Sequence, residues 1–148
     1  MAKVRLTKEF HFEMAHALWN YDGLCKNIHG HSYILFVTVI GEPITDPNNS
    51  KLGMVMDFGD LKNIVNEEIV DQLDHSIVLS KATPNLEQLN IEQMFERFFI
   101  TDYQPTCENM IVDFAEKIKM RLPLDVKLHS LKVHESATSF AEWYSEDN

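Results

Sequence analysis

Apolar residues near the start of the chain fall mainly on even positions. They are Val4, Leu6, Phe10, Phe12 and Met14. This two-residue period predicts a β-strand with one buried face, and His16 continues its parity. The segment 31–40, HSYILFVTVI, is rich in β-branched and aromatic residues and predicts a second strand. Asn, Asp and Gly residues in 19–30 predict an intervening loop, so we expect the two strands to pair as a hairpin.

Two later segments have the three- and four-residue apolar spacing of amphipathic helices. Asp57 is a suitable N-cap for the first helix, which is expected to run to about residue 73. Thr106 can cap the second helix, and Pro123 ends it. Residues 127–135 and 139–144 predict a closing strand pair. The pattern is least clear in 76–103, where 84–94 favours a short helix and 97–101 a strand.

This order of elements predicts a single α+β domain over residues 1–148, with helices on one face of an antiparallel sheet. The chain carries 13 Lys and Arg residues against 23 Asp and Glu, a formal charge of −10. Such a balance argues against nucleic acid as the partner, because a phosphate backbone needs a basic surface. It does not exclude a small anionic substrate.

The sequence also predicts a cytoplasmic protein without a membrane anchor. The first residues, MAKVRLTKEF, lack the apolar stretch of a signal peptide. No run approaches the roughly 18 apolar residues that a membrane span needs. The two cysteines, Cys25 and Cys107, do not make a disulfide framework, and reduced thiols suit the cytosol.

The sharpest chemical signal is His29-Gly30-His31. Residues two apart on an extended segment project to the same side, so both imidazoles can reach one ion. His16, at the end of the neighbouring strand, can supply a third ligand. Three histidines without a fourth ligand are typical of catalytic zinc, with one position open to water or substrate. The alternative is a surface or turn feature, which is common for an isolated H-x-H pair.

Three further groups are candidates for acid–base chemistry or binding. Cys25 lies four residues before His29, where a dication would favour its thiolate; it could instead be a fourth zinc ligand or an inert core thiol. Asp74 could orient His75, or the pair could be a solvated helix end. Glu135 could bind a ligand edge with two parallel N–H groups, or lie at an exposed strand end. We expect Cys107 to be structural, and His11, His129 and His134 to be surface or sheet residues.

Six segments, taken in order, resemble the 6-pyruvoyl-tetrahydropterin synthase / 6-carboxytetrahydropterin synthase family. They are FHFEMAHAL (10–18), CKNIHGHSY (25–33), GMVMDFGDLK (53–62), LDHSIVL (73–79), PTCEN (105–109) and VHES (133–136). Each segment alone is weakly specific, but six in register span most of the chain and together are highly specific.

The resemblance implies the tunnelling fold, in which a four-stranded antiparallel sheet carries two helices on one face. It also implies a homohexamer, built from two stacked trimers, with pterin sites between subunits. The Asp74-His75 pair would then need to reach only the zinc site of a neighbouring subunit.

The resemblance also implies roles for individual residues. His16, His29 and His31 match the zinc ligands; Cys25, Asp74 and His75 match the catalytic groups; Glu135, Thr106 and Glu108 match the pterin-binding residues. The spacing C-x-x-x-H-G-H is similar to the bacterial queuosine-pathway branch. The implied reaction converts 7,8-dihydroneopterin triphosphate to 6-carboxytetrahydropterin, acetaldehyde and triphosphate. Lys26 and Lys51 are guesses for the triphosphate contacts.

Two departures from the family pattern, and two alternatives, accompany this assignment. Residues 82–95 look like an insertion that could change the pocket rim, and Ser136 stands where threonine is frequent. One alternative activity is that of 6-pyruvoyl-tetrahydropterin synthase, with the same fold and metal. The other is a non-catalytic protein that binds zinc or pterin.

Overall fold

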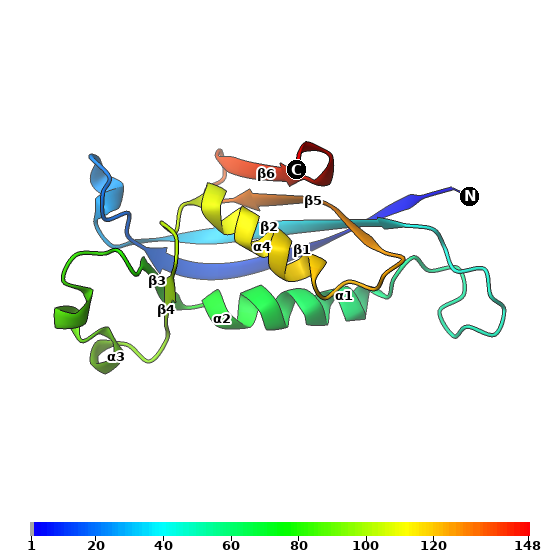
Figure 1. Cartoon of the computed structure of the whole chain (residues 1–148), viewed down its shortest axis with the longest axis horizontal. Helices are drawn as coiled ribbons and strands as arrows, with labels where there is room; N and C mark the ends of the chain where they lie inside the picture. The colour runs from blue at the N-terminus through cyan, green and yellow to red at the C-terminus, as the bar shows by residue number, and fades with distance from the viewer. Residues whose placement is uncertain (1) are drawn as a thin grey trace.

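The computed structural model describes residues 2–148 and contains one mixed sheet with helices packed against it (Figure 1). The order of its six strands is β4-β3-β1-β2-β5-β6. The strands are β1 (Val4–His16), β2 (His29–Gly41), β3 (Ser76–Ser80), β4 (Phe98–Thr101), β5 (Lys127–His134) and β6 (Phe140–Tyr144). The predicted hairpin is confirmed as the antiparallel pair β1–β2, and the closing pair as β5–β6.

The prediction of a four-stranded antiparallel sheet was wrong. Strands β1, β2, β5 and β6 do form such a unit, but β3 pairs parallel to β1, and β4 pairs parallel to β3. All five residues of β3 are buried, so its sequence, SIVLS, has no alternation to reveal it. Its parallel partner β1 is about 60 residues away in the chain, which no local pattern reports.

Two long helical segments cover one face of the sheet (Figure 1). The first consists of α1 (Phe58–Val65), a π-helical turn (Asn66–Val70) and α2 (Asp71–Leu73). The second is α4 (Cys107–Lys119). Both predicted N-caps are confirmed, because Asp57 accepts from the backbone N–H of Gly59 and Thr106 from that of Asn109. None of the helices within residues 2–148 is long and apolar enough to span a membrane.

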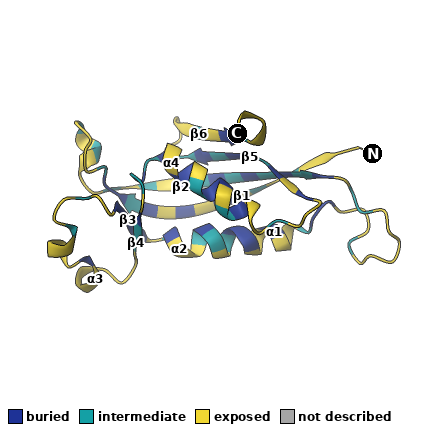
Figure 2. Cartoon of the chain, in the orientation of Figure 1, coloured by how far each residue is buried: buried dark blue, intermediate teal, exposed yellow. Residues whose placement is uncertain are grey.

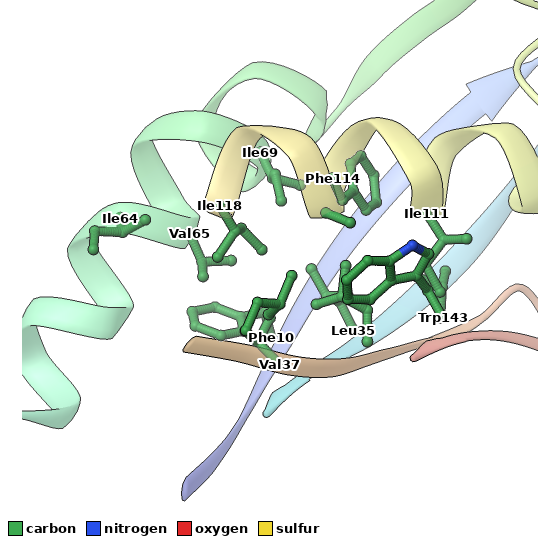
Figure 3. Packing of buried hydrophobic residues seen from close by; sticks show 14 of the residues in the cluster. Phe10, Leu35, Val37, Ile64, Val65, Ile69, Ile111, Phe114, Ile118 and Trp143 are labelled. Carbon is green, nitrogen blue, oxygen red and sulfur yellow. The ribbon is translucent and has the colours of Figure 1, made fainter. Parts of the chain in front are cut away.

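The main core lies between this sheet face and the helices. Figure 3 shows Phe10 of β1 and Leu35 and Val37 of β2 packed beneath Phe114 and Ile118 of α4. Figure 2 shows the matching pattern, with buried residues along the middle of the sheet and exposed ones on the outer helix surfaces. Even positions of β1 and odd positions of β2 therefore face the helices.

Beside β3, the opposite face is covered by the segment that the sequence marked as an insertion. Residues 82–95 form a 3-10 turn (Leu86–Leu89) and the short helix α3 (Ile91–Met94), seen at the left of Figure 1. A second, smaller core lies beneath them and consists of Ala17, Ile77, Leu79 and Ile91. The expected helix at 84–94 is thus two short pieces, and both faces of the sheet carry structure at this end.

Candidate active site

The register of the β1–β2 hairpin brings the three predicted metal ligands together. His16 lies directly opposite His29, and Met14 opposite His31. The three imidazoles lie on the helix-covered face at the end of the hairpin, and their ligand nitrogens are all within 4.8 Å of one another. The predicted convergence of His16, His29 and His31 is therefore observed.

The outer ring nitrogens fix how two of these imidazoles are protonated. The Nδ1 atom of His16 lies 2.7 Å from the carbonyl oxygen of Pro105, and that of His29 lies 2.7 Å from the carbonyl oxygen of Asn27. A carbonyl oxygen can only accept, so each Nδ1 carries a proton and each Nε2 is left as the atom that can present a lone pair. This outward N–H donation is the usual support for a histidine that binds a metal.

The inner nitrogens fit a zinc ion. The two Nε2 atoms of His16 and His29 lie 3.0 Å apart, and two lone pairs at that separation repel unless a cation lies between them. Tetrahedral zinc has Zn–N bonds of about 2.0–2.1 Å. Two nitrogens bound to one such ion must lie at a distance close to the 3.0 Å separation of these two Nε2 atoms. Within residues 2–148, the cluster of metal-ligating side chains consists of the three histidines alone, which leaves a coordination position for water or substrate.

His16 is the most buried of the three, at 1% exposure. Burial lowers its pKa to about 4, and the positive charge that His29 and His31 can carry acts in the same direction. His16 is therefore neutral at physiological pH, as metal binding requires.

Glu135 faces the histidine cluster. Its Oε1 atom lies 3.7 Å from Nε2 of His16 and 3.7 Å from Nε2 of His31. Glu135 is therefore not an exposed strand end without contacts, which was the alternative interpretation of its position. Beneath it, burial raises the pKa of Tyr33, and the negative charge of Glu135 adds to that shift, so the phenol stays protonated. Glu135 also acts on the hydroxyl as a side-chain hydrogen-bond partner, but the hydroxyl makes no hydrogen bond of normal length within residues 2–148.

The start of α4 forms the neighbouring wall. Pro105, which holds His16, is followed by Thr106, whose hydroxyl caps α4, and by the buried Cys107. Burial raises the pKa of Cys107 to about 11, with a further contribution from Glu135. These properties agree with the structural role predicted for this thiol. Glu108 is exposed in the first turn of α4.

Cys25 lies in a 3-10 turn, Leu24–Lys26, just before β2. It is a half-buried free thiol outside the histidine cluster. Its carbonyl oxygen accepts from the backbone N–H of Leu18 at 2.9 Å, which ties the turn to the end of β1. This geometry gives no support to Cys25 as a fourth ligand closing the metal site.

Asp74 and His75 form a side-chain pair, although they are adjacent in sequence. The Oδ2 atom of Asp74 lies 3.0 Å from Nδ1 of His75. His75 adopts a left-handed backbone conformation, with φ of 59°, which turns its ring back toward Asp74. A hydrogen bond from the backbone N–H of Glu13 lowers the pKa of Asp74, and the bond with His75 acts in the same direction. Asp74 is therefore an ionised acceptor.

His75 lines a groove of about 710 Å³ on the other side of the sheet. The sheet residues at this groove include Glu13 and Ser32, which alternate with the residues that face the helices. The insertion contributes Met94 and Phe95 to the opposite wall. His31 of the histidine cluster also lines this groove, whereas His16 is buried and bonded to Pro105.

Several residues around these groups were not predicted from the sequence. Tyr33 shares the parity of His29 and His31 on β2, and that parity could have placed it beside them. The backbone of Glu13 and the side chain of Arg97, which bind the Asp74-His75 turn, gave no sequence signal. Lys51 forms an ion pair with Asp60 in the loop region at the opposite end of the hairpin from the histidines.

Comparison with known proteins identifies the family of the chain. The model of the 6-pyruvoyl tetrahydropterin synthase family matches residues 5–146. The 6-carboxy-5,6,7,8-tetrahydropterin synthase of Haemophilus influenzae is 32% identical over 141 residues, covering 94% of this chain and 97% of that protein.

Solved structures show the same fold. The crystal structure of an uncharacterized protein from Wolinella succinogenes superposes with a TM-score of 0.82 at 22% identity, covering 98% of this chain and 99% of that one. The 6-pyruvoyl tetrahydropterin synthase of Caenorhabditis elegans gives 0.68 at 24% identity, covering 98% and 97%. With nearly the whole sequence matched by the family model, the chain belongs to the 6-pyruvoyl tetrahydropterin synthase family.

Proposed function

We propose that the protein is a zinc-dependent lyase that converts 7,8-dihydroneopterin triphosphate to 6-carboxy-5,6,7,8-tetrahydropterin, acetaldehyde and triphosphate. The observation that carries the proposal is the convergence of three imidazole nitrogens with Glu135 beside them. The Haemophilus influenzae relative carries the name of this activity. The product would enter deazapurine (queuosine) biosynthesis in the cytoplasm.

His16, His29 and His31 would hold the zinc ion. When bound, zinc would supply Lewis-acid polarisation of the oxygens on the substrate side chain. Glu135 would accept two N–H groups of the pterin ring and so fix its orientation. Thr106 and Glu108 at the start of α4 would complete the pterin-binding wall.

Cys25 and His75 would move the protons. The thiolate of Cys25 would remove a carbon-bound proton from the side chain, and His75, oriented by Asp74, would handle the proton on the opposite side. The pairing of Asp74 Oδ2 with His75 Nδ1 at 3.0 Å supports that orientation. It leaves Nε2 of His75 as the atom that exchanges a proton with substrate.

A second copy of the chain would complete the site. His75 and His31 both line the groove, but the cluster of metal-ligating groups within residues 2–148 holds His16, His29 and His31 without Asp74 or His75. This separation supports a composite site in which the pair from one subunit meets the metal of another. We therefore propose a homohexamer made of two trimers, to be checked by sedimentation or light scattering.

The proposal is tested by incubating the purified protein with 7,8-dihydroneopterin triphosphate and measuring acetaldehyde. Acetaldehyde with 6-carboxytetrahydropterin is the expected result. Triphosphate release with a 6-pyruvoyl product and no acetaldehyde would instead establish the synthase alternative. Binding of pterin without turnover would establish a non-catalytic protein.

A matched pair of variants assigns the chemistry to the proposed thiol. Cys25→Ala should keep the metal and the assembly but lower turnover by about 10²-fold or more, which is the range for an acid–base group. Cys107→Ala is the control, because that thiol is buried and donates to the carbonyl of Val133. Full activity of Cys25→Ala would remove Cys25 from the mechanism.

A further inference from the structure

The end of the first helical segment is held by an arginine from another part of the chain. Arg97, immediately before β4, donates from Nε to the carbonyl oxygen of Asp74 at 2.9 Å and from Nη2 to that of Asp71 at 2.5 Å. Its own carbonyl oxygen accepts from the backbone N–H of Ile77 at 3.2 Å. Arg97 is therefore hydrogen-bonded to the backbone on both sides of the Asp74-His75 turn.

The turn that Arg97 holds is an unfavourable one for its sequence. A left-handed conformation is unfavourable for a residue with a β-carbon, and after a helix this position usually carries glycine. Here it carries His75. Such a conformation persists only where the surroundings fix it.

Glu13 provides the other restraint. Its backbone N–H donates to Oδ1 of Asp74 at 2.8 Å, and its carbonyl oxygen accepts from the backbone N–H of His75 at 2.6 Å. β1 thus fixes the carboxylate from one side, and Arg97 fixes the Asp74 carbonyl from the other. With both in place, the second carboxylate oxygen is directed at Nδ1 of His75.

We propose that Arg97 is a positioning residue for the Asp74-His75 pair, which it keeps in the conformation needed for proton transfer in the groove. The role in turnover rests on the proposed function, but the positioning itself does not. Arginine suits the task because its planar guanidinium offers several donors in a fixed fork, whereas lysine offers one flexible ammonium. The insertion and β4 that follow β3 would then be the scaffold that delivers Arg97 to the pair.

The proposal differs measurably from simple helix capping. A cap that only satisfies the carbonyls of α2 would change stability when removed and leave the His75 ring as it is. A positioning role also fixes the ring tautomer, because the ionised Asp74 accepts a proton held at Nδ1. Loss of Arg97 would release the turn and mix the Nδ1–H and Nε2–H forms.

The test compares Arg97→Ala and Arg97→Lys with Arg121→Ala. Arg121 is a matched control because it donates to Glu67 and Glu68 on the same helical segment, eight and seven residues before His75. The tautomer is read from nitrogen NMR of histidine-labelled protein at a pH where the ring is neutral, with the His75 signal identified by its loss in His75→Gln.

We expect the wild type and Arg121→Ala to show the Nδ1–H form and both Arg97 variants to show a mixture. On the lyase assay, kcat of the Arg97 variants should fall by about 10²-fold, the usual effect of misplacing a reacting group, with KM little changed. If Arg97→Ala does not fold, Arg97→Lys keeps the charge and still removes the fork. An unchanged tautomer in the folded variants would overturn the proposal, whether or not the protein is a lyase.

Discussion

The Nε2 atoms of His16 and His29 face each other at 3.0 Å while the Nδ1 atom of each ring is bound to a backbone carbonyl oxygen. The backbone thus directs both Nε2 atoms at the same point. In the metal-free protein these two nitrogens must share a proton or repel each other. A bound cation would accept both lone pairs and remove that conflict.

Metal binding should therefore stabilise the fold. We expect about one zinc ion per chain by elemental analysis, and a lower melting temperature after chelation. Zinc at 100 times its dissociation constant should restore about 2.7 kcal/mol of stability. His31→Ala should lose the metal. His129→Ala, a substitution on β5 outside the cluster, should retain it, and equal metal content in the two variants would contradict the assignment.

The metal-free protein should lose stability on mild acidification. His16 has a pKa of about 4 in the folded chain, whereas the ordinary value, which applies to the unfolded chain, is 6.5. Between these values the unfolded chain binds a proton that the folded chain does not, so the free energy of unfolding falls as the pH is lowered from about 6.5 to about 4. At about 1.4 kcal/mol per pKa unit, the loss is on the order of 3 kcal/mol. Denaturation of metal-free protein over this pH range measures it.

The control for this prediction is His16→Gln, which removes the titrating ring. Its stability should vary less over the same interval. A variant whose pH dependence equals that of the wild type would show that other groups are responsible.

The two thiols should react very differently with an alkylating reagent. Cys25 is half-buried in a surface turn, whereas Cys107 is 7% exposed and burial raises its pKa to about 11. Because only the thiolate is nucleophilic, iodoacetamide at neutral pH should modify Cys25 first and leave Cys107 intact until the protein unfolds. Peptide mass spectrometry reads both sites, and early modification of Cys107 would be contrary to this structure.

The phenol of Tyr33 should cost stability in the ligand-free protein. Its hydroxyl is buried and makes no hydrogen bond of normal length within residues 2–148, so Tyr33→Phe should raise the free energy of unfolding by about 1 kcal/mol. Tyr103→Phe is the matched opposite case, because that hydroxyl donates to Asp113 at 2.8 Å. Its removal should lower stability by about 1–2 kcal/mol. Urea denaturation of the two variants should therefore show shifts of opposite sign.

The parts of the site that follow local periodicity could be predicted from the sequence. His16 continues the two-residue period of its strand, and His29 and His31 share one face of the next strand. Pairing of the two strands as a hairpin then brings all three together without any long-range information. The helix caps at Asp57 and Thr106 were predicted for the same reason, since a cap acts within three residues.

The parts that depend on tertiary contacts could not be predicted in this way. The Asp74-His75 pair was doubtful because adjacent side chains seldom meet in an extended chain; they meet here because His75 is left-handed. That conformation is held by Glu13 and Arg97, which are distant in sequence. β3 escaped notice because it is short and buried on both faces. The catalytic role of Cys25 stays a prediction, as do the pterin contacts of Glu108 and Glu135.

The π-helical turn at Asn66–Val70 sets the rotational phase of everything after it. An α-helix advances by about 100° per residue, and a π turn accommodates one residue more than an α turn does. The wide turn absorbs the extra residue, so the residues of α2 keep the phase that an uninterrupted α-helix would give them. Deleting one residue from the regular turns of α1 would instead rotate the end of the segment by about that angle and carry Asp74 away from the β1 backbone. The number of residues between the start of α1 and the end of α2 therefore determines whether Asp74 meets β1, as much as the identity of any side chain does.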